Sequence, residues 1–189
     1  MIDNPLVENI LTFWFTSPRS KTYGKRQPMW FNSTPKIDQE IKLRYEKILE
    51  EAKKGSFENL QETPEGILAL ILLFDQFPRN MFRDSYKAYE TDDKARNLAQ
   101  KAIDLGFDQK LPPFMRPFIY LPFEHSENLK DQEKSVALFK VLGDEQSFSY
   151  ATLHQDVIKR FGRFPFRNNS LGRVSTEAEI SFMKEPRMF

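Results

Sequence analysis

The chain has 189 residues, enough for one domain with a substantial buried core, and its formal net charge is only +1. We therefore predict a single domain over residues 1–189. Apolar residues make up 40% of the chain and charged residues 29%, which is typical of a globular protein, and the 18 phenylalanines predict an aromatic core. The absence of cysteine excludes disulfides, thiolate nucleophiles and cysteine-ligated zinc, and it suits a reducing compartment.

The first residues, MIDNPLVENILTFWF, lack the basic region and long apolar run of a secretory signal, so we predict a cytoplasmic location. The longest apolar run, residues 66–74, is far shorter than the roughly 20 residues that span a bilayer. A near-neutral charge also argues against general nucleic-acid binding, which is typical of strongly basic domains. We expect neither a nucleic acid nor a membrane as a partner, and the sequence does not define an oligomeric state.

The N-terminal half contains three helix starts in which a capping side chain precedes proline. These starts are Asn4-Pro5, Thr34-Pro35 and Thr63-Pro64. They predict a helix over residues 5–15, a second one that ends at Gly55, and an apolar central helix that ends before Pro78. We interpret residues 16–33 as a loop that Met29, Trp30 and Phe31 anchor to the core.

The C-terminal half also shows helical patterns. Thr91 predicts the cap of a helix that stops at Gly106, and Pro112-Pro113 predict a shorter helix through Tyr120. Two more helices are expected over residues 128–142 and 147–161, and Ser175-Thr176 with Glu179 form a capping-box pattern before a short last helix. No run alternates apolar and polar residues over a strand's length. The sequence therefore predicts an all-α fold of antiparallel helix pairs, with about 7–9 helices.

A first polar segment follows the apolar central helix, where Asp75 and Arg79 stand four residues apart. An isolated buried charge is costly, so these side chains must be solvated, paired with each other, or bound to a ligand. We treat both as candidate ligand-binding residues, with a structural ion pair as the alternative.

A second polar segment contains Glu124, His125 and Glu127. Carboxylates at the start of the next helix would favour its dipole, which accounts for Glu127 without any ligand. Neither histidine of the chain has the spacing of a helical metal site, so we predict no metal and no cofactor.

The third polar segment covers residues 154–173, where no acidic residue follows Asp156 and basic side chains alternate with phenylalanines. Helical spacing turns His154 toward the apolar face of its helix, where it can be a core residue or an acid–base group. The basic side chains include Arg160, Arg163, Arg167 and Arg173. Guanidinium groups bind carboxylates and phosphates in a two-pronged manner, so these arginines can hold an anion or pair internally with Asp75, Glu124 and Glu127.

Together the motifs DQFPRN, PFEHSE, HQDVIKRFGRFPFRN and LGR resemble those of a bacterial family, domain of unknown function 924. The resemblance covers essentially the whole chain and implies a tetratricopeptide-like helical bundle or short solenoid. It implies no activity. Members of that family tend to have histidine where this chain has Phe166, which argues against proton transfer at this position.

We hypothesise that the three polar segments converge on one concave pocket for a small anionic molecule. His154 or Glu124 would act as general base if the protein is an enzyme, with hydrolytic or acid–base chemistry, and Arg163 would stabilise negative charge. The expected ligand contacts are Asp75, Arg79, His125, Glu127, Arg160, Arg163 and Arg167. One alternative is a peptide-binding scaffold whose groove exposes Phe82, Tyr86 or Tyr89, and another is a buried polar network that only fixes helix packing.

Overall fold

A computed structural model describes residues 4–30 and 32–185 of the chain, and every regular element in these ranges is helical. This confirms the all-α prediction. The contacts divide the chain into two compact units. The N-terminal unit runs to Arg83 and includes Lys87–Ile119, and the C-terminal unit contains Asp84–Tyr86 and the residues from Tyr120 onward. The single domain over residues 1–189 and the tetratricopeptide-like arrangement stay predictions.

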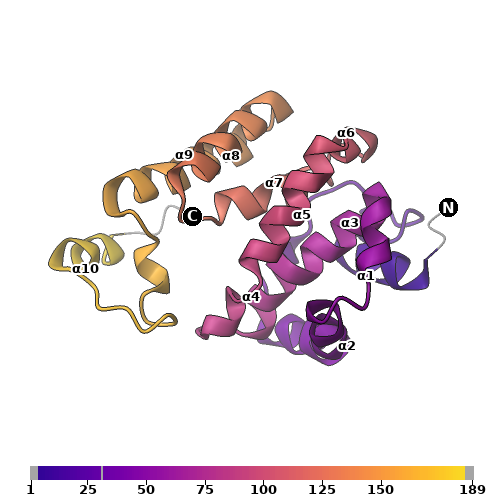
Figure 1. Cartoon of the computed structure of the whole chain (residues 1–189), viewed down its shortest axis with the longest axis horizontal. Helices are drawn as coiled ribbons and strands as arrows, with labels where there is room; N and C mark the ends of the chain where they lie inside the picture. Colours follow the sequence, from indigo (N-terminus) through magenta and orange to yellow (C-terminus); the bar gives the residue numbers. More distant parts are fainter. Residues whose placement is uncertain (1–3, 31, 186–189) are drawn as a thin grey trace. The chain divides into compact units, whose positions relative to one another are not determined.

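In the N-terminal unit α3 packs against α1 and α5, and α2 packs against α4. Figure 1 shows the path of these helices, which are α1 (Pro5–Phe15), α2 (Pro35–Lys53), α3 (Pro64–Ile71), α4 (Phe77–Met81), α5 (Asp92–Asp104) and α6 (Phe107–Lys110). Short 3-10 helices cover Pro28–Trp30, Glu58–Glu62 and Tyr86–Ala88. None of the helices among residues 4–30 and 32–185 combines the length and apolar character that a membrane crossing requires.

The three predicted helix starts of this unit are confirmed. The side chain of Asn4 accepts hydrogen bonds from two backbone N–H groups of α1, and Thr34 and Thr63 each accept one from the first turn of α2 and α3. Proline follows each cap, at a position where a helix needs no N–H donor. These starts are local, so the sequence alone places them correctly.

The helical path does not end before Pro78 as the sequence predicted. A π-helical segment, Leu72–Gln76, follows α3 directly, and the backbone N–H of Phe77 donates to the carbonyl of Leu72. Pro78 then lies in the first turn of α4, where its missing N–H leaves no hydrogen bond unmade. The wider π turn thus lets the chain stay helical on both sides of a proline.

Aromatic rings build the core of the N-terminal unit. Trp14 packs edge-on against Phe118 and in a tilted arrangement against Phe77, with ring centroids 5.7 and 5.6 Å apart. Trp30 contacts Phe118 at 4.9 Å, and its indole N–H donates to the backbone carbonyl of Trp14 at 2.9 Å. The prediction that this part of the loop is anchored is therefore supported for Trp30, whereas Phe31 lies outside the described residues.

In the C-terminal unit α8 (Leu129–Leu142) and α9 (Glu145–Phe161) lie side by side (Figure 1). Only two residues connect them, which makes the pair an antiparallel hairpin. The 3-10 helix Pro165–Arg167 and α10 (Glu177–Met183) follow, and the predicted capping box at Thr176 and Glu179 is present. An apolar cluster of this unit joins Val157, Ile158, Phe164 and Phe182.

Two predicted starts differ from the structure. Thr91 precedes α5, but its hydroxyl donates to the carbonyl of Phe74 at 2.6 Å and caps nothing. The helix expected from Pro112 is α7 (Pro117–Glu124), because the two prolines begin a turn that the amide of Met115 closes. Local sequence identified the capping residue type here, but tertiary contacts decided its use.

Candidate functional site

The end of α7 and the middle of α9 bring together the two predicted acid–base residues. Glu124 is buried, and its Oε1 lies 3.4 Å from Nδ1 of His154. The carbonyl oxygen of Tyr150, one turn earlier on α9, lies 2.9 Å from the same Nδ1. Both neighbours are acceptors, so the tautomer that fits this geometry carries its proton on Nδ1. The hydrogen bond to Tyr150 holds the ring, and Glu124 lies within ion-pair distance of the imidazole if it is protonated.

Phe164 forms one wall beside this imidazole. Its ring meets His154 edge to face, with centroids 5.6 Å apart and an interplanar angle of 76°. The guanidinium carbon of Arg167 lies 4.5 Å from the centre of the same ring. One buried phenylalanine therefore places a cation and the acid–base pair in the same neighbourhood.

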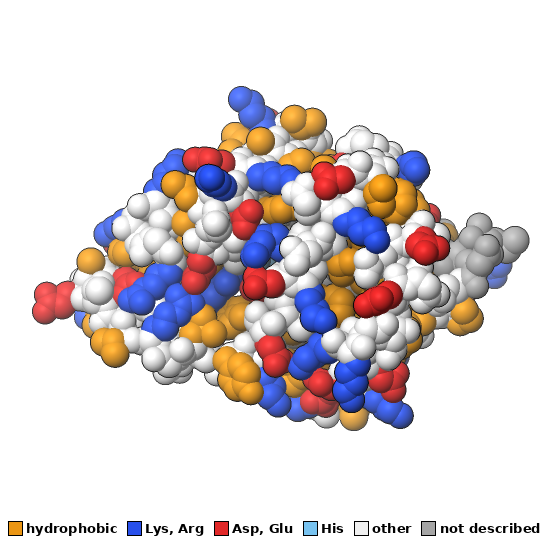
Figure 2. Space-filling view, in the orientation of Figure 1, with side chains coloured by type: hydrophobic (Ala, Val, Ile, Leu, Met, Phe, Trp, Pro, Cys, Tyr) orange, Lys and Arg blue, Asp and Glu red, His pale blue; other side chains and the backbone are white. Residues whose placement is uncertain are grey.

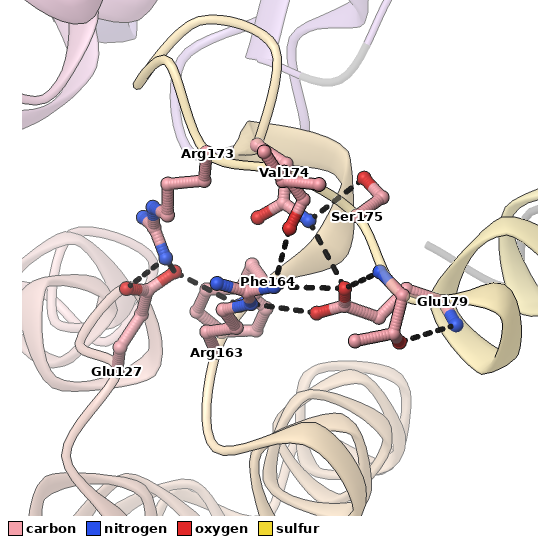
Figure 3. Close-up of polar contacts among 9 residues, drawn as sticks. Glu127, Arg163, Phe164, Arg173, Val174, Ser175 and Glu179 are labelled. Carbon is pink, nitrogen blue, oxygen red and sulfur yellow. Dashed lines mark hydrogen bonds and ion pairs between the residues drawn. The ribbon is translucent and has the colours of Figure 1, made fainter.

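Glu127, in the turn between α7 and α8, holds the segment after α9. Figure 3 shows its carboxylate facing Arg173, whose Nη1 donates at 2.9 Å and Nη2 at 3.1 Å. The same carboxylate accepts the backbone N–H of Phe164 at 2.8 Å. These charge-assisted bonds fix both the wall beside His154 and the loop that returns from it.

Arg163 is engaged by a carboxylate of α10. Its Nε and Nη2 donate to the two oxygens of Glu179 at 2.6 and 2.9 Å, and Nη2 also donates to the carbonyl of Val174 at 2.9 Å (Figure 3). The Arg163 guanidinium, with help from the backbone N–H of Thr176, lowers the pKa of Glu179 to about 2. Nε and Nη2 of Arg163 therefore both donate hydrogen bonds within the C-terminal unit.

Arg160 differs from Arg163 and Arg173. Its guanidinium carbon lies 4.7 Å from the ring centre of Phe161 and 5.5 Å from that of Phe182, and the side chain is exposed. Within residues 4–30 and 32–185, no carboxylate pairs with it. Figure 2 shows Lys and Arg side chains gathered over the part of the C-terminal unit that carries α10 and the 3-10 helix before it. This face can attract an anion.

His125 follows α7 directly and is half-buried, with its backbone N–H donating to the carbonyl of Leu121. It belongs to the C-terminal unit, as do six other predicted site residues, Glu124, Glu127, His154, Arg160, Arg163 and Arg167. In the part of the chain that the structure describes, no three histidine or acidic side chains are arranged to hold a metal ion.

Asp75 and Arg79 belong to the N-terminal unit. Asp75 is fully buried in the π-helical segment, and Nη1 of Arg79 lies 3.1 Å from its Oδ1. Both terminal nitrogens of Arg79 also bind Asp92 on α5, at 2.9 and 3.0 Å. Burial opposes the charge of this arginine, but the two carboxylates outweigh it and raise its pKa. This geometry supports the structural ion pair that the sequence offered as an alternative.

Sequence reasoning missed three acids that these networks use. Asp92 takes the prongs of Arg79, and Asp38 on α2 accepts from Asn80 at 2.8 Å and pairs with Arg83. Glu179 was identified only as part of a capping box, although it also binds Arg163. The basic excess of residues 154–173 signalled that counter-charges were needed, but no local pattern says which acid supplies them.

The fold and the site define an all-helical protein in which arginine–carboxylate pairs hold the segment beside buried Glu124 and half-buried His154. The chain belongs to the family described as "Bacterial protein of unknown function (DUF924)", whose profile matches residues 10–187. It is similar to the solved structure of a protein of unknown function from Agrobacterium tumefaciens, at 35% identity and a TM-score of 0.86, with 96% of this chain and 98% of that chain covered. No curated protein matches the chain.

Proposed function

We propose that the C-terminal unit binds a small anionic molecule and performs acid–base chemistry on it, with hydrolysis as the reaction class. The observation that carries the proposal is the pair of Glu124 and His154. Glu124 is buried beside Nδ1 and would stabilise the protonated imidazole, while the hydrogen bond between Nδ1 and the Tyr150 carbonyl holds the ring, and this arrangement suits His154 to proton transfer.

Support for the anion comes from the basic side chains of the same unit. Arg160 is stacked on two phenylalanine rings, and Arg167 lies over the ring that also contacts His154. The exposed guanidinium of Arg160 can donate to a carboxylate or a phosphate while it rests against these rings. Glu127 and Arg163 contribute by holding the segment that carries these groups.

In this mechanism the arginines fix the anionic group and His154 acts on water. Nε2 takes a proton from the water molecule whose oxygen attacks the acyl or phosphoryl centre. The imidazolium then returns that proton to the leaving oxygen, so His154 ends in its starting state. The carboxylate of Glu124 would lower the free energy of the imidazolium intermediate. The assignment of Asp75, Arg79 and His125 to the same ligand stays a prediction.

Titration calorimetry with inorganic phosphate at low ionic strength tests the binding step. We expect saturable binding that Arg160→Gln weakens about tenfold, equivalent to about 1.4 kcal/mol. Lys140→Gln is the matched control, because Lys140 is also exposed and cationic but lies on α8. Equal losses in the two variants, or no binding by the natural chain, would refute an anion site at Arg160.

The chemical step needs a separate readout. Turnover of aryl phosphates and aryl esters is expected to disappear in His154→Gln and to fall in Glu124→Gln, while phosphate binding persists in both. Turnover that survives in His154→Gln would show that the imidazole is not the proton carrier.

One observation favours the peptide-binding alternative. Tyr86 is 56% exposed, as a groove-lining aromatic would be. Phe82 and Tyr89 are half-buried, with Lys42 and Lys87 over the ring of Phe82 and Arg79 over the ring of Tyr89. A single exposed ring is ordinary on a protein surface, so we rank this scaffold second.

A further inference from the structure

A cavity of about 660 Å³ opens beside α1 in the N-terminal unit. Its walls come from α1, from the segment that follows it as far as Ser20, and from Arg44 on α2. The volume lies within the range of small-molecule sites in proteins. No residue of this cavity takes part in the function proposed above, so it is an independent feature of the chain.

The charges in the wall cancel. Glu8 and Arg44 are the charged residues among those that line the cavity, one of each sign. Arg44 also pairs with Glu40, a residue outside the lining, at 2.6 Å from its Nη2. A charged ligand would therefore meet a like charge beside an opposite one, and neither an anion nor a cation gains net attraction. The wall favours a ligand without formal charge.

The wall offers both donors and acceptors of hydrogen bonds. Glu8 accepts and Arg44 donates, while the hydroxyl of Thr12 can do either. Asn9 accepts from the phenol of Tyr45 through Oδ1 at 2.8 Å, which leaves its amide nitrogen as a donor. Burial raises the pKa of Tyr45 to about 12, so the phenol keeps the proton that it donates.

Phe13 supplies a rigid apolar element of the wall. Its ring meets Tyr45 edge to face at 5.4 Å and Phe77 at 6.2 Å, and the guanidinium of Arg44 lies over it at 5.2 Å. These neighbours hold the ring in place, which lowers the entropic cost of packing a ligand against it.

Thr16, which also lines the cavity, has an unusual backbone conformation. Its φ of 68° and ψ of 167° lie in a region that is essentially restricted to glycine, although the residue is β-branched. Its hydroxyl is buried and has no hydrogen-bond partner within the described parts of the chain. Strain of this kind persists where the surroundings impose it and is concentrated at ligand sites.

From these features we infer that the cavity is a binding site for a small neutral polyhydroxylated molecule, of the size of a monosaccharide or disaccharide. Each hydroxyl of such a ligand both donates and accepts, which matches the mixed wall of Glu8, Asn9, Thr12 and Arg44. Its C–H faces match the ring of Phe13.

Saturation-transfer difference NMR with glucose, galactose, maltose and glucuronate tests this inference. We expect transfer to at least one neutral sugar and little to glucuronate. Thr12→Val removes one hydroxyl without changing the side-chain shape, and it should weaken binding at least threefold. Glu8→Gln leaves Arg44 as the charged residue among those that line the cavity, so the preference should move toward glucuronate.

Two variants serve as controls. Lys47→Ala changes an exposed residue of α2 outside the cavity, and Arg160→Gln changes the proposed anion site in the other unit. Both should bind the neutral sugar as the natural chain does. The inference is overturned if no neutral sugar shows transfer, or if Thr12→Val and Glu8→Gln leave both the signal and the preference unchanged.

Discussion

Replacing Arg79 with methionine removes the cation that faces two carboxylates of the N-terminal unit. Asp75 is 0% exposed, and Arg79 contacts both this residue and Asp92 at hydrogen-bonding distance. Methionine keeps an unbranched apolar stem but donates no hydrogen bond. The carboxylate of Asp75 would then stay buried without the charge that compensates it.

The expected loss follows from this burial. Breaking a buried ion pair by removing one partner costs about 3–5 kcal/mol. For a chain of this length, the melting temperature would fall by about 6–20 °C. Adding Asp75→Asn to the Arg79→Met variant removes the stranded charge, so the double variant should recover part of the lost stability.

The matched control is Arg44→Met. Arg44 and Glu40 are also four residues apart on one helix, but their side chains are 48% and 42% exposed, so this pair should contribute less than about 1 kcal/mol. Urea unfolding followed by circular dichroism measures all variants. Equal losses for Arg79→Met and Arg44→Met, or no recovery in the double variant, would refute the structural role assigned to Arg79.

Two further predictions concern stability. Because Arg163 holds the pKa of Glu179 at about 2, below its usual 4.5, the stability that Glu179 contributes is complete above about pH 4.5 and lost as the pH falls toward 2. Unfolding free energies between about pH 5 and 2 should therefore fall less steeply in Glu179→Gln, and identical slopes would contradict the assignment. Thr16→Gly should raise the free energy of unfolding by about 1 kcal/mol, since glycine adopts this backbone conformation freely. Thr12→Gly, inside α1, is the control and should lower the free energy of unfolding by a similar amount. Unchanged stability in Thr16→Gly would argue against strain at this residue.

Features that depend on a few neighbouring residues could be predicted. The caps at Asn4, Thr34 and Thr63 and the capping box of Thr176 and Glu179 act within one helical turn, and each is present. The N–H groups in the first turn of a helix have no partner within the helix, and the side chain of the preceding residue accepts from them. The local sequence is therefore enough to predict these helix starts.

For ion pairs between distant segments, the sequence predicted the type of partner but not the individual residue. The run of arginines implied that carboxylates must face them, and Arg173 does pair with Glu127, which is 46 residues away. Arg163 instead pairs with Glu179, whose capping role was its only local signal. The cavity beside α1 is lined by the turn at Thr16 and by Arg44 from another helix. No pattern within one segment predicts that these two segments lie close together.

The π-helical segment Leu72–Gln76 has a consequence for how this chain can vary in length. A π turn holds one residue more than an α turn, so deleting one residue here would restore ordinary helical hydrogen bonds. Because the π turn fits its extra residue into nearly the same rotation and rise as an α turn, the deletion would leave the residues beyond it facing as before. Asn80 would still face Asp38, and Arg79 would still face Asp92. A deletion in the regular turns of α3 would instead rotate these side chains by about 100°, so the π segment is the place where this helical path can lose one residue and keep its polar contacts.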